Sequence, residues 1–570
     1  MFQSNLANIE VQEPSSPLDY LLTSGGDLRL RVDPVRMLNG YGCQPWPRPE
    51  AFTFASSTAT SISDRAFLAA EEVRRQLVGS SRKGRLENAC DHHAERLREQ
   101  IRKFLNLGNS GTEIIFSPSG TDSQIHALYI AQTVLDGPFV TIIVGAEETG
   151  SGTAHAMIGC HFSSDTARGS QVIKGMRIPG FAEPSIKIEI QLRDKNGSLR
   201  SNDAVNQEVL STVAQEVASR KRVILHVMDT SKLGSRCPSP ECLRQIRSTW
   251  GQSVQVVVDA CQMRLSRQRL QYYLAQNFLV FITGSKFLTG PPLSGALLVP
   301  AATSALMKQR HKVPEGLEFY TNQTDWPIDW HGIRSKLPTH PNVGQLLRWV
   351  AAVEELRAYF SVPAFYRFMA LREFSRVVPN MIAKRPNLQM VPSFEKPVAD
   401  GIDDEEMSAR TIFPFFIKNR GQSLSVEACS RLYRALNIDV SNLLPRSASP
   451  YQRQLALRLC HIGQPVAVLN PSQGFAGTLR ISAGARVVSE TWHPAETNAS
   501  LQGLTQEFAQ VSTILDKIDL LVENIDALED LDKIENRTST CEAASSRLVS
   551  RWTAMDNIQH SPVQSGRGNG

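Results

Sequence analysis

The chain has 570 residues, of which 41% are hydrophobic and 21% charged, the composition of an ordinary globular protein with two or three folded units. This composition excludes a collagen-like chain, a disulfide scaffold and a wholly disordered chain. The net charge of +5 arises from 61 basic and 56 acidic residues, and so small an excess predicts no nucleic-acid partner. Only 16 of the basic residues are lysines, so a lysine in an unusual position is informative.

Neither a secretory signal nor a membrane span is visible. Residues 1–17 lack a basic region followed by an apolar one, and no run approaches the ~20 apolar residues of a membrane helix. The nine cysteines are scattered, and the pair Cys237 and Cys242 has no second pair at zinc-site spacing. We therefore expect a cytoplasmic protein with free buried thiols, no metal site and no membrane partner.

The first half of the chain predicts an α/β domain behind an irregular arm. Residues 1–50 are rich in Pro and Gly and form the expected arm, and helical periods begin near residue 62. Nearly continuous Val and Ile runs, separated by segments long enough for helices such as 122–135 and 240–249, indicate a mostly parallel sheet buried on both faces. The predicted strands are Ile114–Phe116, Phe139–Val144, Ile186–Ile190, Val223–Val227, Val254–Val258, Leu279–Ile282 and Ala296–Val299. We assign 51–312 to this large domain.

The second half predicts a smaller α+β domain. Residues 313–342 form a connecting segment interrupted by Pro, Trp and Gly, and 343–535 form the C-terminal domain. Its predicted elements are a helix near 343–359, a strand at Thr411–Ile417, a helix near 425–436, an edge strand at Gly477–Ser482 and a long terminal helix over 504–528. Residues 536–570 are polar and predicted to be disordered.

Two polar features follow predicted strands, where open α/β sheets bind ligands. The turn Ser119-Gly120-Thr121 precedes a helix whose dipole favours an anion such as phosphate, although a plain helix cap would use the same residues. Asp259 follows a hydrophobic strand, where a carboxylate needs a cation or a hydrogen-bond donor. A protonated pyridine nitrogen would satisfy it, as would a helix cap or an arginine.

The third feature is a lysine between two predicted strands. Lys286 lies in the small-residue loop Thr283-Gly284-Ser285-Lys286, which Gly290-Pro291 follows. Desolvation there would lower its pKa and make it a competent Schiff-base nucleophile. A solvated loop lysine is the alternative.

Together, the phosphate turn, Asp and Lys occur in the chain order of pyridoxal-phosphate (PLP) enzymes of fold type I. The sequence resembles the class V aminotransferase and cysteine desulfurase superfamily in Asp259-Ala260-Cys261-Gln262, in Lys286 followed by Gly290-Pro291, and in Arg480-Ile481-Ser482. The resemblance covers roughly residues 50–530. It implies a fold type I large domain with a mostly parallel sheet, a smaller C-terminal domain, PLP as cofactor and a homodimer, with the neighbour contributing near Gly290-Pro291.

The resemblance also implies roles for individual residues. Lys286 would hold the cofactor as a Schiff base and shuttle a proton, Asp259 would keep the pyridine nitrogen protonated, and Gln262 would bond the ring hydroxyl. Arg480 would bind a substrate carboxylate, although a surface arginine on an edge strand is the alternative. The remaining residues expected at the cofactor are Ser119, Gly120, Thr121, Asp229, Thr283 and Ser285.

The sequence departs from the family pattern at the ring face. The usual stacking His is absent at Glu148-Thr149-Gly150, and His155 or His161 could replace it only through a local shift. Ser285 precedes the lysine where His is common, and Asp229 stands in the element that usually bears Asn. A desulfurase needs a mobile exposed thiolate, yet the candidate loop 442–451 contains no Cys, so desulfurase chemistry is disfavoured.

The sequence therefore predicts a PLP-dependent enzyme acting on an amino acid or amine, with transamination first. A lyase that eliminates at the β-carbon, cleaves a C–S bond or decarboxylates is the alternative within the enzyme class. A non-catalytic scaffold that keeps the fold is the alternative of another class.

Overall fold

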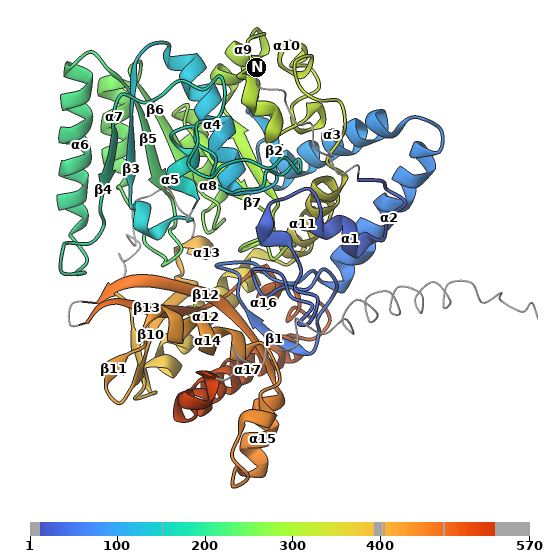
Figure 1. The fold of residues 1–570 in the computed structure, drawn as a ribbon, viewed down its shortest axis with the longest axis vertical. Coiled ribbons are helices and arrows are strands. Elements are labelled where there is room, and N and C mark those ends of the chain that lie inside the picture. The colour runs from blue at the N-terminus through green and yellow to red at the C-terminus, as the bar shows by residue number, and fades with distance from the viewer. Residues whose placement is uncertain (1–11, 151, 393–401, 403–404, 471–472, 530–570) are drawn as a thin grey trace, which may run out of the picture.

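The computed structural model describes residues 12–150, 152–392, 402, 405–470 and 473–529, and the predicted disordered tail lies outside these ranges. Within these ranges the chain forms two separate β-sheets, one of seven strands and one of six. Figure 1 shows the larger sheet with its helices above and the smaller sheet, with the long α17, below.

The larger sheet is mostly parallel and buried. Its strand order is β2-β8-β7-β6-β5-β3-β4, and only β8 runs against the other six. The strands are β2 (Glu113–Ser117), β3 (Phe139–Val144), β4 (Lys187–Ile190), β5 (Arg222–Met228), β6 (Val254–Asp259), β7 (Leu279–Thr283) and β8 (Gly295–Val299). All seven predicted strands are present, and the predicted α/β class with a mostly parallel central sheet is confirmed.

Crossover helices return the chain between the parallel strands, so that every parallel strand ends at the same edge of the sheet. Ser63, Ser119, Ser201, Ser239 and Ser266 each accept a hydrogen bond from a backbone N–H of the helix that they precede. The helices up to this sheet's end are α1 (Leu18–Thr23), α2 (Asp64–Ser81), α3 (Leu86–Phe104), α4 (Gly120–Leu135), α5 (Thr153–Ala156), α6 (Asn202–Ala218), α7 (Pro240–Trp250), α8 (Arg267–Ala275) and α9 (Ala301–Lys308).

The smaller sheet has the order β1-β12-β13-β10-β11, with β9 also paired to β10. Its strands are β1 (Ala51–Phe54), β9 (Leu388–Met390), β10 (Ile412–Asn419), β11 (Gln422–Ser423), β12 (Leu459–Asn470) and β13 (Gly474–Ser482). The prediction of an edge strand at 477–482 is wrong, because β13 lies between β12 and β10. Its polar residues Thr478 and Arg480 are buried and bonded within the protein rather than facing water.

One strand joins the two halves of the sequence. β1 pairs in parallel with β12, so residues 51–54, which sequence analysis placed in the large domain, belong to the smaller sheet. The helices of this half are α10 (His331–Arg334), α11 (Val343–Ser361), α12 (Ala364–Ala383), α13 (Glu405–Ser408), α14 (Val426–Leu436), α15 (Pro450–Leu457), α16 (Ala485–Ser489) and α17 (Thr497–Glu523). The chain therefore passes through the smaller sheet before it builds the larger one.

Other predictions from composition can be compared with the described ranges. The eight cysteines described there are free and buried, and Cys541 lies outside them. No helix in the described ranges combines the length and the apolar character needed to cross a membrane.

Candidate active site

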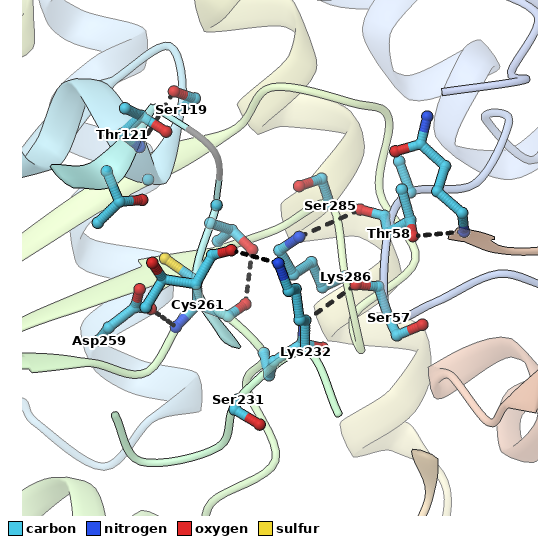
Figure 2. A pocket seen from close by; sticks show the side chains of 18 of the residues that line it. Ser57, Thr58, Ser119, Thr121, Ser231, Lys232, Asp259, Cys261, Ser285 and Lys286 are labelled. Atoms are coloured by element: carbon cyan, nitrogen blue, oxygen red, sulfur yellow. Dashed lines mark hydrogen bonds between the residues drawn. The ribbon is translucent and has the colours of Figure 1, made fainter. Parts of the chain in front are cut away.

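A cavity of about 420 Å³ opens where the parallel strands of the larger sheet end. Its lining comes from the loops after β2, β3, β5, β6 and β7, from β12 and β13 of the smaller sheet, and from the N-terminal arm. Figure 2 shows residues from these segments converging on one space. The cavity gathers side chains more than 400 residues apart in sequence.

The loop after β2 forms a cup at the start of α4. The Ser119 hydroxyl oxygen accepts hydrogen bonds from the backbone N–H groups of Thr121 (3.2 Å) and Asp122 (3.3 Å), and Ser119, Gly120 and Thr121 all line the cavity. A Cβ on Gly120 would lie 2.5 Å from the Cys261 sulfur, so only glycine leaves this approach open. The positive end of the helix dipole at this turn suits a bound anion.

Asp259 ends β6 and turns its carboxylate toward the cavity. One oxygen, Oδ1, accepts a hydrogen bond from the backbone N–H of Cys261 at 3.0 Å. Burial raises the pKa of Asp259, while this hydrogen bond and the Lys286 charge act in the opposite direction. The carboxylate is therefore placed to accept a proton-bearing group in the cavity.

Gln262 is oriented by an arginine. Its Oε1 accepts a hydrogen bond from Arg264 Nη1 at 2.7 Å, and its Nε2 donates to the Ser57 carbonyl at 3.0 Å. The bond from Arg264 fixes the amide, so that one N–H of the Gln262 amide remains available to a ligand acceptor. Thr283, at the end of β7, donates its hydroxyl to the Cys261 carbonyl at 2.7 Å and lines the cavity.

Lys286 follows β7 and extends into the cavity beside Ser285. Its ammonium donates to the Thr58 carbonyl at 3.3 Å, a long hydrogen bond. Burial lowers the pKa of Lys286 to about 8, and the nearby Arg480 charge acts in the same direction against the attraction of Asp259. An appreciable fraction of the side chain is therefore a neutral amine near pH 8, the form that attacks a carbonyl carbon.

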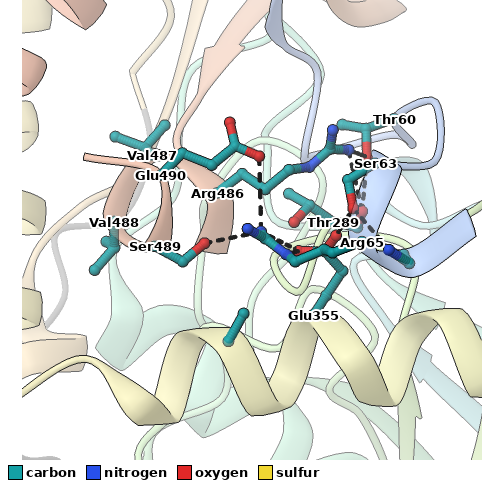
Figure 3. A network of polar contacts seen from close by, with 12 residues as sticks. Thr60, Ser63, Arg65, Thr289, Glu355, Arg486, Val487, Val488, Ser489 and Glu490 are labelled. Carbon is teal, nitrogen blue, oxygen red and sulfur yellow. Dashed lines mark hydrogen bonds and ion pairs between the residues drawn. The ribbon is translucent and has the colours of Figure 1, made fainter. Parts of the chain in front are cut away.

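The Lys286 loop is fixed from behind by a polar network, shown in Figure 3. Arg486 of α16 donates to the Thr289 carbonyl at 3.1 Å and to the Thr60 hydroxyl at 2.6 Å. Glu355 of α11, fully buried, accepts hydrogen bonds from the Ser63 hydroxyl and from Arg65, at 2.6 Å from its Nη2. The Arg486 contacts connect the end of the loop, at Thr289, to α16 and to the segment after β1, and they limit the positions that Lys286 can adopt.

A second lysine, which sequence analysis did not single out, lines the same cavity. Lys232, in the loop after β5, donates to the Thr149 carbonyl at 2.8 Å, and Figure 2 shows it extending into the cavity as Lys286 does. Burial lowers the pKa of Lys232 to about 8, with Arg480 and Lys286 acting in the same direction. The buried carboxylate of Glu148 bonds Ser231 and Arg193 instead of forming an ion pair with this ammonium. The scarcity of lysine was the signal that could have identified Lys232.

Arg480 of β13 reaches the cavity from the smaller sheet. Its guanidinium donates to the carbonyls of Lys232 (3.0 Å) and Gln464 (2.7 Å) and to the Thr58 hydroxyl (3.0 Å). None of the described residues accepts a hydrogen bond from its buried Nε. Burial lowers the pKa of Arg480 to about 10 and leaves it charged at neutral pH. Arg480 therefore brings a positive charge to the cavity lining, where it can attract an anionic ligand group.

Two of the residues considered for the ring face lie elsewhere. Asp229 is buried outside the cavity lining, with Tyr273 donating to it at 2.9 Å and Arg236 at 3.4 Å. Its neighbours Thr230, Ser231 and Lys232 line the cavity instead. His161 bonds the Tyr320 hydroxyl, and the described residues that line the cavity include no histidine. The other predicted site residues, namely Ser119, Gly120, Thr121, Asp259, Gln262, Thr283, Ser285, Lys286 and Arg480, all line it.

The N-terminal arm also supplies lining residues that sequence analysis did not single out. Arg29 and Tyr41 border the cavity, and Arg29 Nη2 donates to the Ser119 hydroxyl oxygen at 3.0 Å. The Gly290-Pro291 loop, where a neighbouring subunit's contribution was expected, is buried within the chain, and a Cβ on Gly290 would lie 2.8 Å from the Ala352 Cβ.

Comparison with known proteins gives distant structural likenesses. No protein-family model matches the chain, and no curated protein matches it. The chain is similar to the cysteine desulfurase CsdA from Escherichia coli, with 16% identity, coverage of 81% of this chain and 94% of that one, and a TM-score of 0.43. It is similar to Oryza sativa TDC with PLP and tryptamine, with 11% identity, coverage of 81% of this chain and 84% of that one, and a TM-score of 0.45. It is also similar to the cystine C-S lyase C-DES in complex with its product cysteine persulfide, with 12% identity, coverage of 80% of this chain and 97% of that one, and a TM-score of 0.46.

Proposed function

We propose that this protein is a PLP-dependent enzyme that acts on the amino group of an amino acid, with Lys286 as the residue that binds the cofactor and transamination as its reaction. One observation supports this most directly. A lysine with its pKa lowered to about 8, a cavity-facing carboxylate and a helix-start cup lie in one cavity at the carboxyl edge of a mostly parallel sheet.

The residues present fit PLP on three counts. The cup of Ser119, Gly120 and Thr121 suits a phosphate because all three residues line the cavity at the start of α4, where the helix dipole is positive. Asp259 has one carboxylate oxygen bonded to the backbone, and it faces the cavity, where a protonated pyridine nitrogen would compensate its charge. Gln262 has an N–H available for the ring hydroxyl.

Bound PLP supplies an electron sink for the charge that develops when a bond to the substrate Cα breaks. Lys286 can take a proton from the substrate Cα and return it to a neighbouring carbon, because its amine is partly neutral near pH 8 and its loop is fixed from behind. Asp259 keeps its partner nitrogen protonated, and Arg480 orients the substrate through its carboxylate. A single base that removes and returns a proton is what transamination requires.

The test is a titration of the protein with PLP, followed by reduction with borohydride and peptide mass spectrometry. We expect a visible absorbance band and a reduced adduct on Lys286. Lys286→Met should abolish the band, whereas Lys232→Met, a lysine of the same cavity, should keep it. An adduct on Lys232, or a band that survives in Lys286→Met, would contradict the assignment. Wild-type protein without any spectral change would favour the non-catalytic scaffold.

Lys232 supports a second candidate, a lyase that eliminates a group from the β-carbon. A second ammonium in the cavity could give its proton to a leaving group while Lys286 removes the Cα proton. Amino acids should then release ammonia and a keto acid without an acceptor, whereas an aminotransferase requires a keto-acid acceptor. The lyase is excluded if neither the wild type nor Lys232→Met releases ammonia without an acceptor and if Lys232→Met still transaminates.

Desulfurase chemistry fits this cavity poorly. Cys261 is the one cysteine among the described residues that line it. Burial, followed by the adjacent Asp259 carboxylate, raises the pKa of its thiol well above the usual value, so that the thiol is protonated and a weak nucleophile. A residue fixed beside the cup also lacks the mobility that sulfur transfer demands.

A further inference from the structure

The N-terminal arm crosses the cavity, and both domains anchor it there. On the side of the larger sheet, where Trp349 of α11 donates to the Gly295 carbonyl of β8 at 2.9 Å, the fully buried Arg348 of the same helix donates to the carbonyls of Leu22 (3.2 Å) and Gly25 (2.9 Å). On the other side, the Tyr41 carbonyl accepts hydrogen bonds from the Tyr433 hydroxyl (2.9 Å) of α14 and His461 Nε2 (3.0 Å) of β12. The segment between these anchors is therefore fixed at the cavity by contacts with distant parts of the same chain.

Arg29 is the residue that this segment directs toward the cup. Asp27 orients it, because Arg29 Nε donates to Asp27 Oδ1 at 2.8 Å and Nη2 bonds Oδ2 of the same carboxylate. Phe162 packs against the guanidinium, 5.8 Å from its ring centre. Nη2 also donates to the Ser119 hydroxyl oxygen at 3.0 Å, so the cation touches the N-terminal cap of α4.

Charges of both signs surround the cup. The Ser119 hydroxyl donates to the buried Asp122 carboxylate, and burial raises the pKa of that carboxylate to about 7, so that a cation beside the cup is needed before an anion can bind there. Arg29, Lys232, Lys286 and Arg480 are the cationic side chains among the described lining residues, and Arg29 alone of them hydrogen-bonds a cup residue. Asp27 occupies the Nε and Nη2 edge of its guanidinium, and the Tyr41 side chain hydrogen-bonds the same guanidinium. The Nη2–Ser119 contact places a planar guanidinium directly beside the cup, and a guanidinium is the side chain best suited to bind phosphate oxygens.

We propose that Arg29 is a ligand of the cofactor phosphate, and that the N-terminal arm thereby completes the phosphate end of the site within one chain. The inference rests on the proposed function, since it assigns a residue to the cofactor of that same site. The arm would then bind the cofactor phosphate of its own chain, without a residue from a neighbouring subunit.

The test compares PLP with pyridoxal, the same ring without the phosphate. We expect Arg29→Gln to raise the dissociation constant for PLP about ten- to hundredfold, the loss typical of a charge-assisted bond, and to leave pyridoxal binding unchanged. Arg31→Gln is the matched control, because Arg31 lies two residues away on the arm with an exposed side chain and borders no part of the cavity. The control should bind both compounds as wild type does.

Equal weakening of PLP and pyridoxal in Arg29→Gln, or no weakening of either, would overturn the proposal. Thermal unfolding verifies the fold of the variant. If Arg29→Gln fails to fold, Arg29→Lys keeps the charge and loses the planar fork, and it should still weaken PLP more than pyridoxal. Inorganic phosphate separates this proposal from the proposed function. If wild type shows no PLP band, but inorganic phosphate raises the Tm of wild type and not of Arg29→Gln, the proposed function is contradicted and the anion-binding role of Arg29 is not.

Discussion

The lowered pKa of Lys286 makes a prediction about stability that needs no substrate. Burial moves this pKa from 10.5 to about 8, and each pKa unit corresponds to about 1.4 kcal/mol, so the charged side chain costs the folded protein about 3 kcal/mol. Screening by solvent in the cavity reduces this to about 2 kcal/mol. Lys286→Met removes the charge and loses only a long hydrogen bond to Thr58, so the cofactor-free variant should be more stable than wild type at pH 7.

The pH dependence has a defined sign. Between pH 8 and 10.5 the unfolded chain keeps the Lys286 proton while the folded chain has lost it, so the unfolded state binds more protons and wild-type stability rises with pH. The advantage of Lys286→Met should therefore be complete below pH 8 and shrink as the pH rises through this window.

Thermal unfolding of cofactor-free protein from pH 7 to 9.5 measures the effect as a difference of about 2 °C in Tm at pH 7. Lys83→Met is the control, because Lys83 is exposed and its replacement should change the free energy of unfolding by less than about 0.5 kcal/mol. A Lys286→Met variant no more stable than wild type at pH 7, or an advantage independent of pH, would refute the reasoning.

Three further substitutions test the site. In Gly295→Ala the new Cβ would lie 2.4 Å from the Ser119 carbonyl carbon, so we expect a displaced cup, a loss of about 1–3 kcal/mol in thermal unfolding and weaker PLP binding. The control Gly79→Ala, in open space on α2, should be stabilising, and equal behaviour of the two would contradict the role of the close contact. Asp259→Asn should weaken PLP about tenfold or more in an absorbance titration, and unchanged affinity would remove Asp259 from the cofactor site. Arg480→Lys should raise about tenfold the amino-acid concentration that half-shifts the cofactor spectrum, while an amine without a carboxylate should be unaffected.

The sequence was sufficient to predict the strands of the larger sheet, because each strand can be recognised from its own residues. Residues such as those of Phe139–Val144 are buried on both faces, so burial requires a continuous apolar run that can be recognised without knowing the fold. Asp259 and Lys286 were recognisable for the same reason, since each is a charged residue directly beyond such a run. The prediction of an edge strand was wrong because polar residues in a strand were taken as a sign of exposure to solvent. Thr478 and Arg480 look solvent-facing in sequence, but their polar atoms are satisfied inside the protein.

What the sequence could not show depends on side-chain direction and on distant contacts. Asp229 and Lys232 belong to the same short loop, and only the buried Tyr273 and Arg236 decide that Asp229 turns away and leaves Lys232 to the cavity. The arm has no periodicity, because contacts some 390 residues away, such as that between Tyr41 and Tyr433, determine its path. Arg29 therefore carries no local signal, and its place beside the cup follows only when both domains are folded around the arm. The path of the arm, which distant contacts determine, therefore positions Arg29 and thereby sets the affinity that we propose for the cofactor.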